Sequence, residues 1–283
     1  KAGGGNTYQF FDASLIDEVK RRRTISRELR HALDQDNFSA HYQPLFDVSG
    51  KEVIGAEALA RWRQDDGTDI SPAEFIPIAE SSGLINQLGE RMLLTACMDC
   101  KAWQDQGLAD VGVAVNVSAS QFRRSDIVAV VTRILKESRL DPALLELELT
   151  ESIVMQDFEE AAHALQRLRK EGVRIAIDDF GTGYSSLTYL KHLPVDRLKI
   201  DQSFIAGVEK QTGDRAITRA VIRLGSGLGI DVTAEGVENK GQLDFLSSKK
   251  CSSVQGFYLA RPMPLKDFVE TVRIKNSTLS VAV

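Results

Sequence analysis

The stretch FSAHYQPLFDVSGKEVIGAEALARW, residues 38–62, decides the fold of this chain. Its two ends, 38–48 and 53–62, are rich in Val, Ile and aromatic residues, which is typical of β-strands. Little more than Ser49-Gly50-Lys51 separates them. A parallel crossover needs roughly a dozen residues or more, so this connection predicts a hairpin. We therefore expect the first strand of the fold to run antiparallel to the second.

Downstream of the hairpin, short strands alternate with helical segments. Six further candidate strands follow, at 111–117, 145–149, 173–178, 195–200, 230–234 and 254–259. Between them the apolar residues recur with helical spacing, as Phe158, Ala161, Leu165 and Leu168 do. Strands that alternate with helices predict a parallel sheet. The eight strands together predict an α/β fold, a (β/α)8 TIM-like barrel with its first strand antiparallel.

The same pattern predicts the domain organisation. No linker rich in glycine and serine interrupts residues 38–275, which predicts one barrel domain over that range. Before it, an apolar stripe that includes Leu15, Val19 and Ile25 predicts a connecting helix over 12–37. The chain opens without an initiator methionine, so we expect residues 1–11 to be the remnant of a preceding domain and 276–283 to be a C-terminal tail.

The composition excludes several classes of protein. Of the 283 residues 43% are apolar and 27% charged, with a net charge of −5, which is typical of a soluble globular domain. No apolar run approaches the roughly 18 residues of a membrane span, and the start lacks the pattern of a signal peptide. We expect a cytoplasmic protein, with membrane tethering through upstream domains left open. The acidic balance argues against duplex nucleic acid as a partner. Cys97 and Cys100 are expected to pack within a helix.

Polar residues recur at the carboxyl ends of the predicted parallel strands. They are Glu57 within the second strand, then Asn116, Glu148, Asp178 with Asp179, Lys199, Glu235 and Gln255. The gaps from Asn116 to Glu148 and on to Asp178 are 32 and 30 residues, about one strand and helix each. Because the carboxyl ends of barrel strands meet at one mouth, we expect these side chains to converge there.

Several carboxylates in one cleft raise each other's pKa unless a cation compensates their charge. The ligands of a first metal ion are expected to be the oxygens of Glu57, Asn116, Glu148 and Asp178. Oxygen ligands suit Mg²⁺ or Mn²⁺, whereas zinc prefers nitrogen and sulfur. The adjacent Asp178 and Asp179 suggest two metal ions. Lys199 among these acids is expected to keep its proton and to orient the nucleophile or neutralise a phosphate oxygen.

Seven motifs carry these residues in order. They are EALARW (57–62), NVS (116–118), ELTE (148–151), DDFGTGYSSL (178–187), LKID (198–201), AEGVE (234–238) and QG (255–256). Together they resemble the EAL family of cyclic di-GMP phosphodiesterases over about residues 20–275. The resemblance implies the same barrel, and hydrolysis of one phosphodiester bond of cyclic di-GMP to linear pGpG. It also implies two Mg²⁺ or Mn²⁺ ions, with Ca²⁺ inhibitory.

The resemblance implies a role for each motif residue. The first metal ion falls to Glu57, Asn116, Glu148 and Asp178, and the second to Asp178, Asp179 and, directly or through water, Glu235. The catalytic residues are Lys199, Glu57 and Glu235, of which Lys199 steadies the attacking water. Gln255 lies near the second metal ion. Arg61 contacts phosphate, Gln43 and Leu59 lie near a guanine, and Tyr258 and Pro262 line the other end of the substrate.

The resemblance also implies how the activity is regulated. The loop from Phe180 to Ser186, with Gly181, Thr182 and Gly183 at its start, is similar to the family's loop that couples dimerisation to metal binding, and Glu151 anchors it. A homodimer is therefore expected. The opening NTYQFF (6–11) resembles the closing strand of a GGDEF domain, which commonly precedes an EAL domain. An upstream GGDEF domain and a sensor domain are expected in the native chain.

Two other functions stay open on the residues alone. The first is a module that binds cyclic di-GMP and transmits the signal without relevant catalysis. The second is a barrel hydrolase of another substrate, such as a glycosidase with two carboxylates. A glycosidase would not need the asparagine, the lysine and four or more acids together, and the metal requirement distinguishes the two kinds of enzyme.

Overall fold

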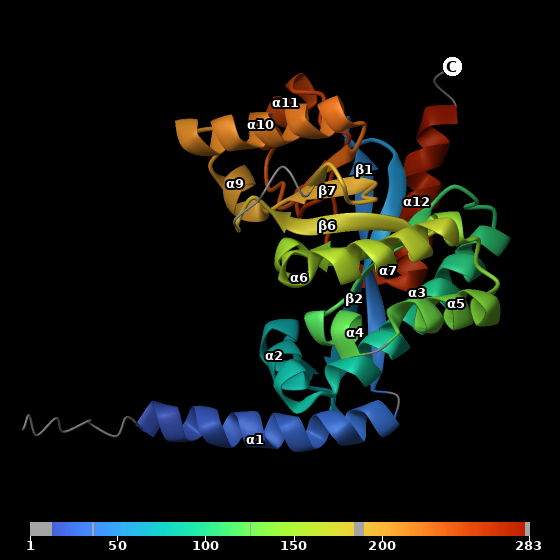
Figure 1. Ribbon diagram of the computed structural model, residues 1–283, viewed down its shortest axis with the longest axis vertical. Helices are drawn as coiled ribbons and strands as arrows, with labels where there is room; N and C mark the ends of the chain where they lie inside the picture. Colours follow the sequence, from blue (N-terminus) through green and yellow to red (C-terminus); the bar gives the residue numbers. More distant parts are fainter. Residues whose placement is uncertain (1–12, 36, 125, 184–189, 281–283) are drawn as a thin grey trace, which may run out of the picture.

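The computed structural model describes residues 13–35, 37–124, 126–183 and 190–280, and shows strands closed into a barrel with helices around it (Figure 1). The barrel strands are β1 (Phe38–Asp47), β2 (Val53–Arg63), β4 (Gly112–Asn116), β5 (Leu145–Thr150), β6 (Arg174–Phe180), β7 (Arg197–Ile200), β8 (Asp231–Ala234) and β9 (Ser253–Val254). Two short strands, β3 (Asp69–Ile70) and β10 (Met263–Pro264), pair with β2 and β1.

The first barrel strand is reversed. β1 pairs antiparallel with β2 on one side and with β9 on the other, and the remaining barrel neighbours are parallel. The turn between β1 and β2 is built on Asp47, whose carboxylate accepts hydrogen bonds from the backbone N–H groups of Ser49, Lys51 and Glu52 at 2.9–3.0 Å. The predicted TIM-like barrel with an antiparallel first strand is confirmed.

The last barrel strand is shorter than predicted. The sequence pattern predicts a strand over 254–259, but β9 ends at Val254. The chain then leaves the sheet and packs against the loop after β8. Two backbone hydrogen bonds hold it there: the N–H of Val237 donates to the carbonyl of Gln255, and the N–H of Tyr258 donates to the carbonyl of Val237. A Cβ on Gly256 would lie 2.2 Å from the Val237 backbone, so only glycine permits this approach.

Helices cover the outside of the barrel (Figure 1). They are α1 (Ala13–Asp34), α2 (Pro72–Ser82), α3 (Ile85–Asp105), α4 (Ala119–Arg124), α5 (Ile127–Ser138), α6 (Glu151–Gln156), α7 (Phe158–Lys170), α9 (Gln202–Ala206), α10 (Thr212–Leu228), α11 (Lys240–Ser248) and α12 (Leu265–Ser280). In Figure 1, α1 runs along one end of the molecule, and its Ile25 and Leu29 are fully buried. Among the described helices, none has the length and apolar character to cross a membrane.

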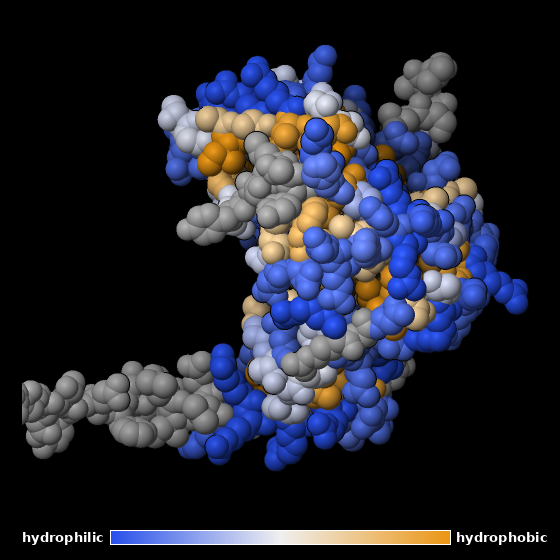
Figure 2. Space-filling model, in the orientation of Figure 1, coloured by the Kyte–Doolittle hydropathy of each residue, from blue (hydrophilic) through white to orange (hydrophobic). Residues whose placement is uncertain are grey.

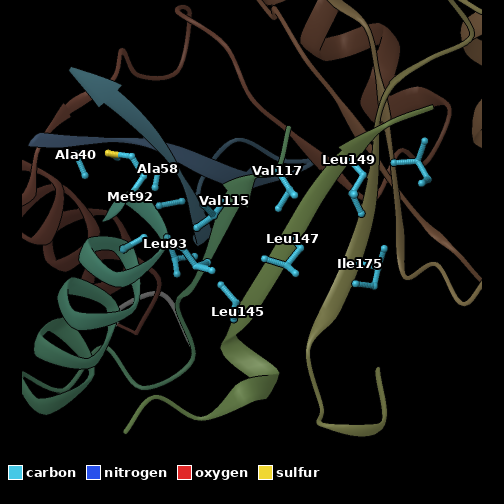
Figure 3. Packing of buried hydrophobic residues seen from close by; sticks show 14 of the residues in the cluster. Ala40, Ala58, Met92, Leu93, Val115, Val117, Leu145, Leu147, Leu149 and Ile175 are labelled. Atoms are coloured by element: carbon cyan, nitrogen blue, oxygen red, sulfur yellow. The ribbon is translucent and has the colours of Figure 1, made fainter. Parts of the chain in front are cut away.

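The apolar core lies between the barrel and its helices. Leu145, Leu147 and Leu149 of β5 are buried together in this layer (Figure 3). Side chains alternate along a strand, so the intervening Glu146 and Glu148 point into the barrel. On the face shown in Figure 2, most of the surface over the helices is hydrophilic. Because the leucines of β5 face the helices, the inward-facing positions of this strand are occupied by polar residues.

The three cysteines are buried and unpaired with one another. Cys97 and Cys100 lie in α3, as predicted, and burial raises the pKa of the Cys97 thiol to about 12. Burial also raises the pKa of Cys251 to about 12. Thiols that stay protonated pack as small apolar groups and are poor metal ligands or nucleophiles.

Candidate functional site

Lys199 lies at the centre of the barrel mouth, with only 2% of its side chain exposed. Its Nζ atom is 2.6 Å from Glu148 Oε2 and 2.7 Å from Glu235 Oε1. The same atom is 3.5 Å from Asp178 Oδ1 and 3.6 Å from Glu57 Oε2. In the sheet of the described residues β7 lies between β6 and β8, so the contacts to β5 and β2 cross the interior of the barrel. The predicted convergence of these side chains is confirmed.

Two side-chain amides donate hydrogen bonds to the carboxylate of Glu57. Asn116 Nδ2 donates to Glu57 Oε1 at 2.7 Å, and Gln255 Nε2 donates to Glu57 Oε2 at 2.8 Å. Gln255 Nε2 is also 3.1 Å from Gln43 Oε1. Gln43 reaches the site because it is the register partner of Glu57 in the antiparallel pair of β1 and β2. The reversed strand therefore supplies a site residue.

Asp178 and Asp179 stand where β6 is irregular. The pairing of β6 with β7 shifts between Ile177 and Phe180, and Asp179 has the left-handed φ of 53°. Neighbouring residues of a regular strand point to opposite faces, so this irregularity breaks the alternation. Burial and the adjacent Asp178 raise the pKa of Asp179. Its carboxyl group thus shares the environment of the acidic cluster.

The charges of the site are strongly coupled. Burial raises the pKa of Glu148 well above its usual value, and the nearby Glu57 raises it further. Burial also raises the pKa of Glu235, to about 7, although Lys199 opposes this. For Glu57, Lys199 and the two amide hydrogen bonds outweigh the effect of burial and lower the pKa. Burial opposes the charge on Lys199, but the four carboxylates outweigh it and raise its pKa. The ammonium group stays charged and is outnumbered by acids.

The donor set fits a hard divalent cation. Carboxylates and one asparagine amide supply oxygen, and these are the ligands that Mg²⁺ and Mn²⁺ prefer. As the side chains stand, no three Asp, Glu, His or Cys groups of the described residues converge as metal ligands. The reason is visible in the contacts, because Glu148 and Glu235 bind the ammonium of Lys199 and Glu57 binds two amide nitrogens. The acids are arranged here around a lysine.

One cavity is lined by Glu57, and a second is lined by Asn116, which bonds to Glu57. The first, of about 190 Å³, is lined by Gln43, Glu57, Gln202, Glu235, Gly236, Glu238, Gln255, Gly256 and Phe257. The second, of about 440 Å³, lies between the ends of β2 and β4 and the helices α2, α3 and α4. Its walls are mainly apolar and include Leu59 and Arg61. The polar cavity therefore borders the acidic cluster at Glu57 and Glu235, whereas the apolar cavity meets the site at Asn116.

Some of the residues expected to bind substrate line a cavity and others do not. Arg61 is half-buried, and its Nη1 donates to the carbonyl of Ala60 at 2.8 Å. Tyr258 is 45% exposed, and neither it nor Pro262 is among the described residues that line the two cavities. Phe257 lines the first cavity instead, with the guanidinium of Arg261 4.3 Å above its ring.

Sequence reasoning missed Phe257, Gln202 and Glu238 as lining residues. The available signals were an aromatic residue directly after the QG motif, a polar residue directly after LKID and the last residue of AEGVE. Phe257 and Gln202 directly follow recognised motifs, and Glu238 belongs to one. Their direction toward the cavity depends on the turns after β7, β8 and β9, which sequence spacing does not specify.

The start of the glycine-rich loop lies against Glu151. Glu151 is 5% exposed at the beginning of α6, and a Cβ built on Gly183 would lie 3.5 Å from its Oε2 atom. Thr182 Oγ1 donates to the carbonyl of Asp179 at 2.8 Å. Gly181 has a φ of 98°, which favours glycine. Residues 184–186 of the predicted loop lie outside the described residues, and the coupling of this loop to dimerisation stays a prediction.

Comparison with known proteins agrees with the geometry. The EAL domain model matches residues 26–262. The chain is 42% identical over 272 residues, 96% of its length, to the bifunctional diguanylate cyclase/cyclic di-GMP phosphodiesterase MucR of Pseudomonas aeruginosa. It is 41% identical over 273 residues to the cyclic di-GMP phosphodiesterase NbdA of the same organism. The chain spans 40% of the length of MucR and 35% of that of NbdA.

Solved structures share the fold. A structure described as the PaMucR phosphodiesterase in complex with c-di-GMP has a TM-score of 0.84 and 44% identity, and the match covers 87% of this chain and 99% of the other. An EAL domain protein from Listeria monocytogenes has a TM-score of 0.76 and 30% identity over 88% of this chain. The match to the family model over most of the chain, with these relatives, shows that the chain belongs to the EAL domain family.

Proposed function

We propose that this domain hydrolyses cyclic di-GMP to linear 5'-pGpG in bacterial second-messenger signalling, with two bound Mg²⁺ or Mn²⁺ ions. The observation that carries the proposal is the buried ammonium of Lys199 within 3.6 Å of four carboxylates at the barrel mouth. Family membership and relatives named as cyclic di-GMP phosphodiesterases support the same reaction. A related structure titled as a c-di-GMP complex supports the substrate.

The acidic cluster would hold the metal ions. Glu57, Asn116, Glu148 and Asp178 would hold the first, and Asp178, Asp179 and Glu235 the second. Divalent ions supply an acidified water molecule and neutralise charge on the phosphodiester. The oxygen donors and the excess of acid over lysine support this assignment, because bound cations would favour the charged forms of Glu148 and Glu235, whose pKa values are raised by burial and by neighbouring carboxylates.

Lys199 has the clearest role in the chemistry. Water attacks phosphorus, the bond from phosphorus to the 3' oxygen breaks, and a proton from the water ends on that oxygen. The ring opens to a single linear product with a 5' phosphate and a 3' hydroxyl. Negative charge grows on the phosphoryl oxygens in the transition state. A fixed ammonium group in a site with little water stabilises such charge more than a solvated one does. Because Lys199 is buried and held by Glu148 and Glu235, it is already oriented before the reaction.

The two cavities suit the two ends of a dinucleotide. The apolar cavity, whose walls include Leu59, would take a flat base, and Arg61, which also lines it, would pair with a phosphate. Phe257 offers an aromatic face for stacking in the polar cavity, beside Gln255. Gln43, expected near the same guanine as Leu59, lines this polar cavity and not the one that Leu59 lines. Tyr258 and Pro262 remain proposed contacts, on the family resemblance alone.

A chromatographic assay tests this function. Purified protein is incubated with cyclic di-GMP in Mg²⁺, Mn²⁺, Ca²⁺ or EDTA, and linear pGpG is measured. Product is expected in Mg²⁺ or Mn²⁺ and not in Ca²⁺ or EDTA. Glu57→Ala should abolish turnover, whereas Glu137→Ala, an exposed control on α5, should not change it. Turnover in EDTA, or wild-type turnover by Glu57→Ala, would overturn the assignment.

The same assay separates the alternatives. Tight binding of cyclic di-GMP without product, in every metal, would favour a sensor module over an enzyme. The glycosidase alternative is not retained, because the chain belongs to the EAL domain family and a lysine occupies the centre of its acids.

We further propose how the domain is organised in its protein. The barrel domain would occupy 38–275, with residues 12–37 as a connecting helix that contains α1. Residues 276–283 are expected to be a tail, but 276–280 continue α12, and the Asn276 side chain bonds to the backbone of Val53. The predicted GGDEF remnant, 1–11, lies outside the described residues. The name of MucR, a bifunctional diguanylate cyclase, supports an upstream GGDEF domain. A cytoplasmic homodimer completes the proposal, and sedimentation of the purified protein with and without cyclic di-GMP tests the dimer.

A further inference from the structure

A second buried polar cluster lies directly beneath the acidic site. Its centre is Arg197 on β7, which is 5% exposed. Arg197 Nε donates to both carboxylate oxygens of Glu146, at 2.9 and 3.0 Å. Its Nη1 donates to Thr233 Oγ1 at 3.1 Å and to Ser253 Oγ at 2.9 Å. One guanidinium group therefore bonds to residues of β5, β8 and β9 across the interior of the barrel.

Each member of this cluster stands two residues before a residue of the site. The four pairs are Glu146 and Glu148, Arg197 and Lys199, Thr233 and Glu235, and Ser253 and Gln255. In β5 and β7 the paired residues i and i+2 face the same way, about 6 to 7 Å apart, and Glu235 and Gln255 follow directly after the ends of β8 and β9. The Arg197 cluster is thus the layer on which the Lys199 cluster rests, and it ties together the same four strands.

Stability alone is a poor reason for such a layer. The interior of a TIM barrel is usually filled with branched apolar side chains. A buried ion pair pays a desolvation cost that often exceeds its Coulombic gain, and apolar residues of similar volume are then at least as stable. Glu146 also lies 3.7 Å from Arg174, which in turn lies 3.3 Å from Asp231. A chain of charged side chains accordingly extends from the Arg197 cluster through Glu146 and Arg174 to Asp231, toward the end of the barrel opposite the site.

We infer that Arg197 is a positioning residue for Lys199. By bonding to three strands at once, it fixes the spacing of β5, β7 and β8 that sets Lys199 Nζ 2.6 and 2.7 Å from Glu148 and Glu235. Its planar fork of donors matches several fixed acceptors, which the single ammonium of a lysine does not. The inference rests on the proposed function in one respect, since it assumes that Lys199 acts on the phosphodiester.

The test compares Arg197→Lys and Arg197→Met with the wild type. The control, Arg215→Lys, removes an arginine that bonds to the Val208 and Glu209 carbonyls and lines neither of the two cavities. Turnover of cyclic di-GMP in Mg²⁺ gives kcat and KM, and titration with cyclic di-GMP in Ca²⁺ gives affinity and the fraction of competent molecules. The ¹⁵N signal of the Lys199 ammonium reports its position independently of activity.

The expected result is a lower kcat with an almost unchanged KM. Displacing a catalytic group by about 1 Å costs up to about 100-fold in rate, so Arg197→Lys should lower kcat by about 10-fold or more. KM and the affinity in Ca²⁺ should stay within about twofold, because the base cavities are untouched. The Lys199 signal should shift or exchange faster with water. Arg215→Lys should match the wild type in all four quantities.

Other outcomes overturn the inference or the function separately. If the Arg197 variants lose thermal stability but keep wild-type kcat per competent molecule and the same Lys199 signal, Arg197 is only structural. If Arg197→Met does not fold, Arg197→Lys decides the question. If the wild type makes no product, the proposed function fails, and an unchanged Lys199 signal in Arg197→Lys then overturns the positioning role on its own.

Discussion

Replacing Lys199 by methionine removes the ammonium group from the acidic cluster and keeps a side chain of similar length. In the described site this group lies within 3.6 Å of four carboxylates. Removal of one partner from a buried ion pair costs about 3–5 kcal/mol. At roughly 2–4 °C per kcal/mol for a domain of this size, the Tm of the metal-free protein should fall by about 10 °C.

The loss of stability in Lys199→Met should increase as pH rises. Burial already raises the pKa of Glu148, and it raises that of Glu235 to about 7. Without Lys199 both values rise further, because the ammonium group no longer favours their charged forms. A carboxyl group with a raised pKa stabilises the fold fully below its unfolded value of about 4.3, and this stability is lost as pH rises through the folded value. The deficit of the variant should be smaller at pH 5 than at pH 8.

Calorimetric unfolding in EDTA at both pH values measures this effect. Lys101→Met is the matched control, because Lys101 also lies 2.6 Å from a carboxylate but that pair is exposed, so it should cost under about 1 kcal/mol. Added Mg²⁺ or Ca²⁺ should restore more of the Tm in Lys199→Met than in the wild type, since a bound cation replaces the missing charge. Turnover should fall by about 100-fold or more. A deficit that is equal at both pH values, or smaller than that of the control, would refute the role of Lys199 as counter-ion.

Three further predictions concern single residues. Asp47→Ala should lower the free energy of unfolding by about 1–3 kcal/mol in urea titrations, because three backbone N–H groups lose their acceptor. Burial alone would raise the pKa of Asp47, but hydrogen bonds from Ser49, Glu52 and Lys51 outweigh it and lower the pKa, so the difference from wild type should shrink as pH falls below about 4. Arg61→Ala should raise KM about tenfold with little change in kcat, and a fall in kcat alone would contradict its role as a phosphate contact. Phe257→Ala should raise KM severalfold in the same steady-state assay, as loss of a base-stacking surface worth about 1–3 kcal/mol requires, whereas an unchanged KM would exclude stacking.

The barrel was predictable because its signals are local. The short connection at 49–52 excludes a parallel crossover, so the direction of β1 followed before any long-range contact was known. Polar residues interrupt apolar strands at Glu148 and Lys199, and the rule that strand ends share one mouth places them together. The end of β9 was not predictable, because Gly256 leaves the sheet to meet the backbone of Val237, a contact with another loop.

Sequence by itself determined the fold class, the reversed first strand and the set of acids that meet at one mouth, since each follows from spacing and from the alternation of side chains along a strand. Only the tertiary structure decided which partner each acid has. That Lys199 binds Glu148 and Glu235, that two amides hold Glu57, and that Arg197 bonds to Glu146 and Ser253 depend on closure of the barrel. Closure brings strands that are not neighbours in the sheet within hydrogen-bond distance across the interior, and no local pattern of residues encodes that distance.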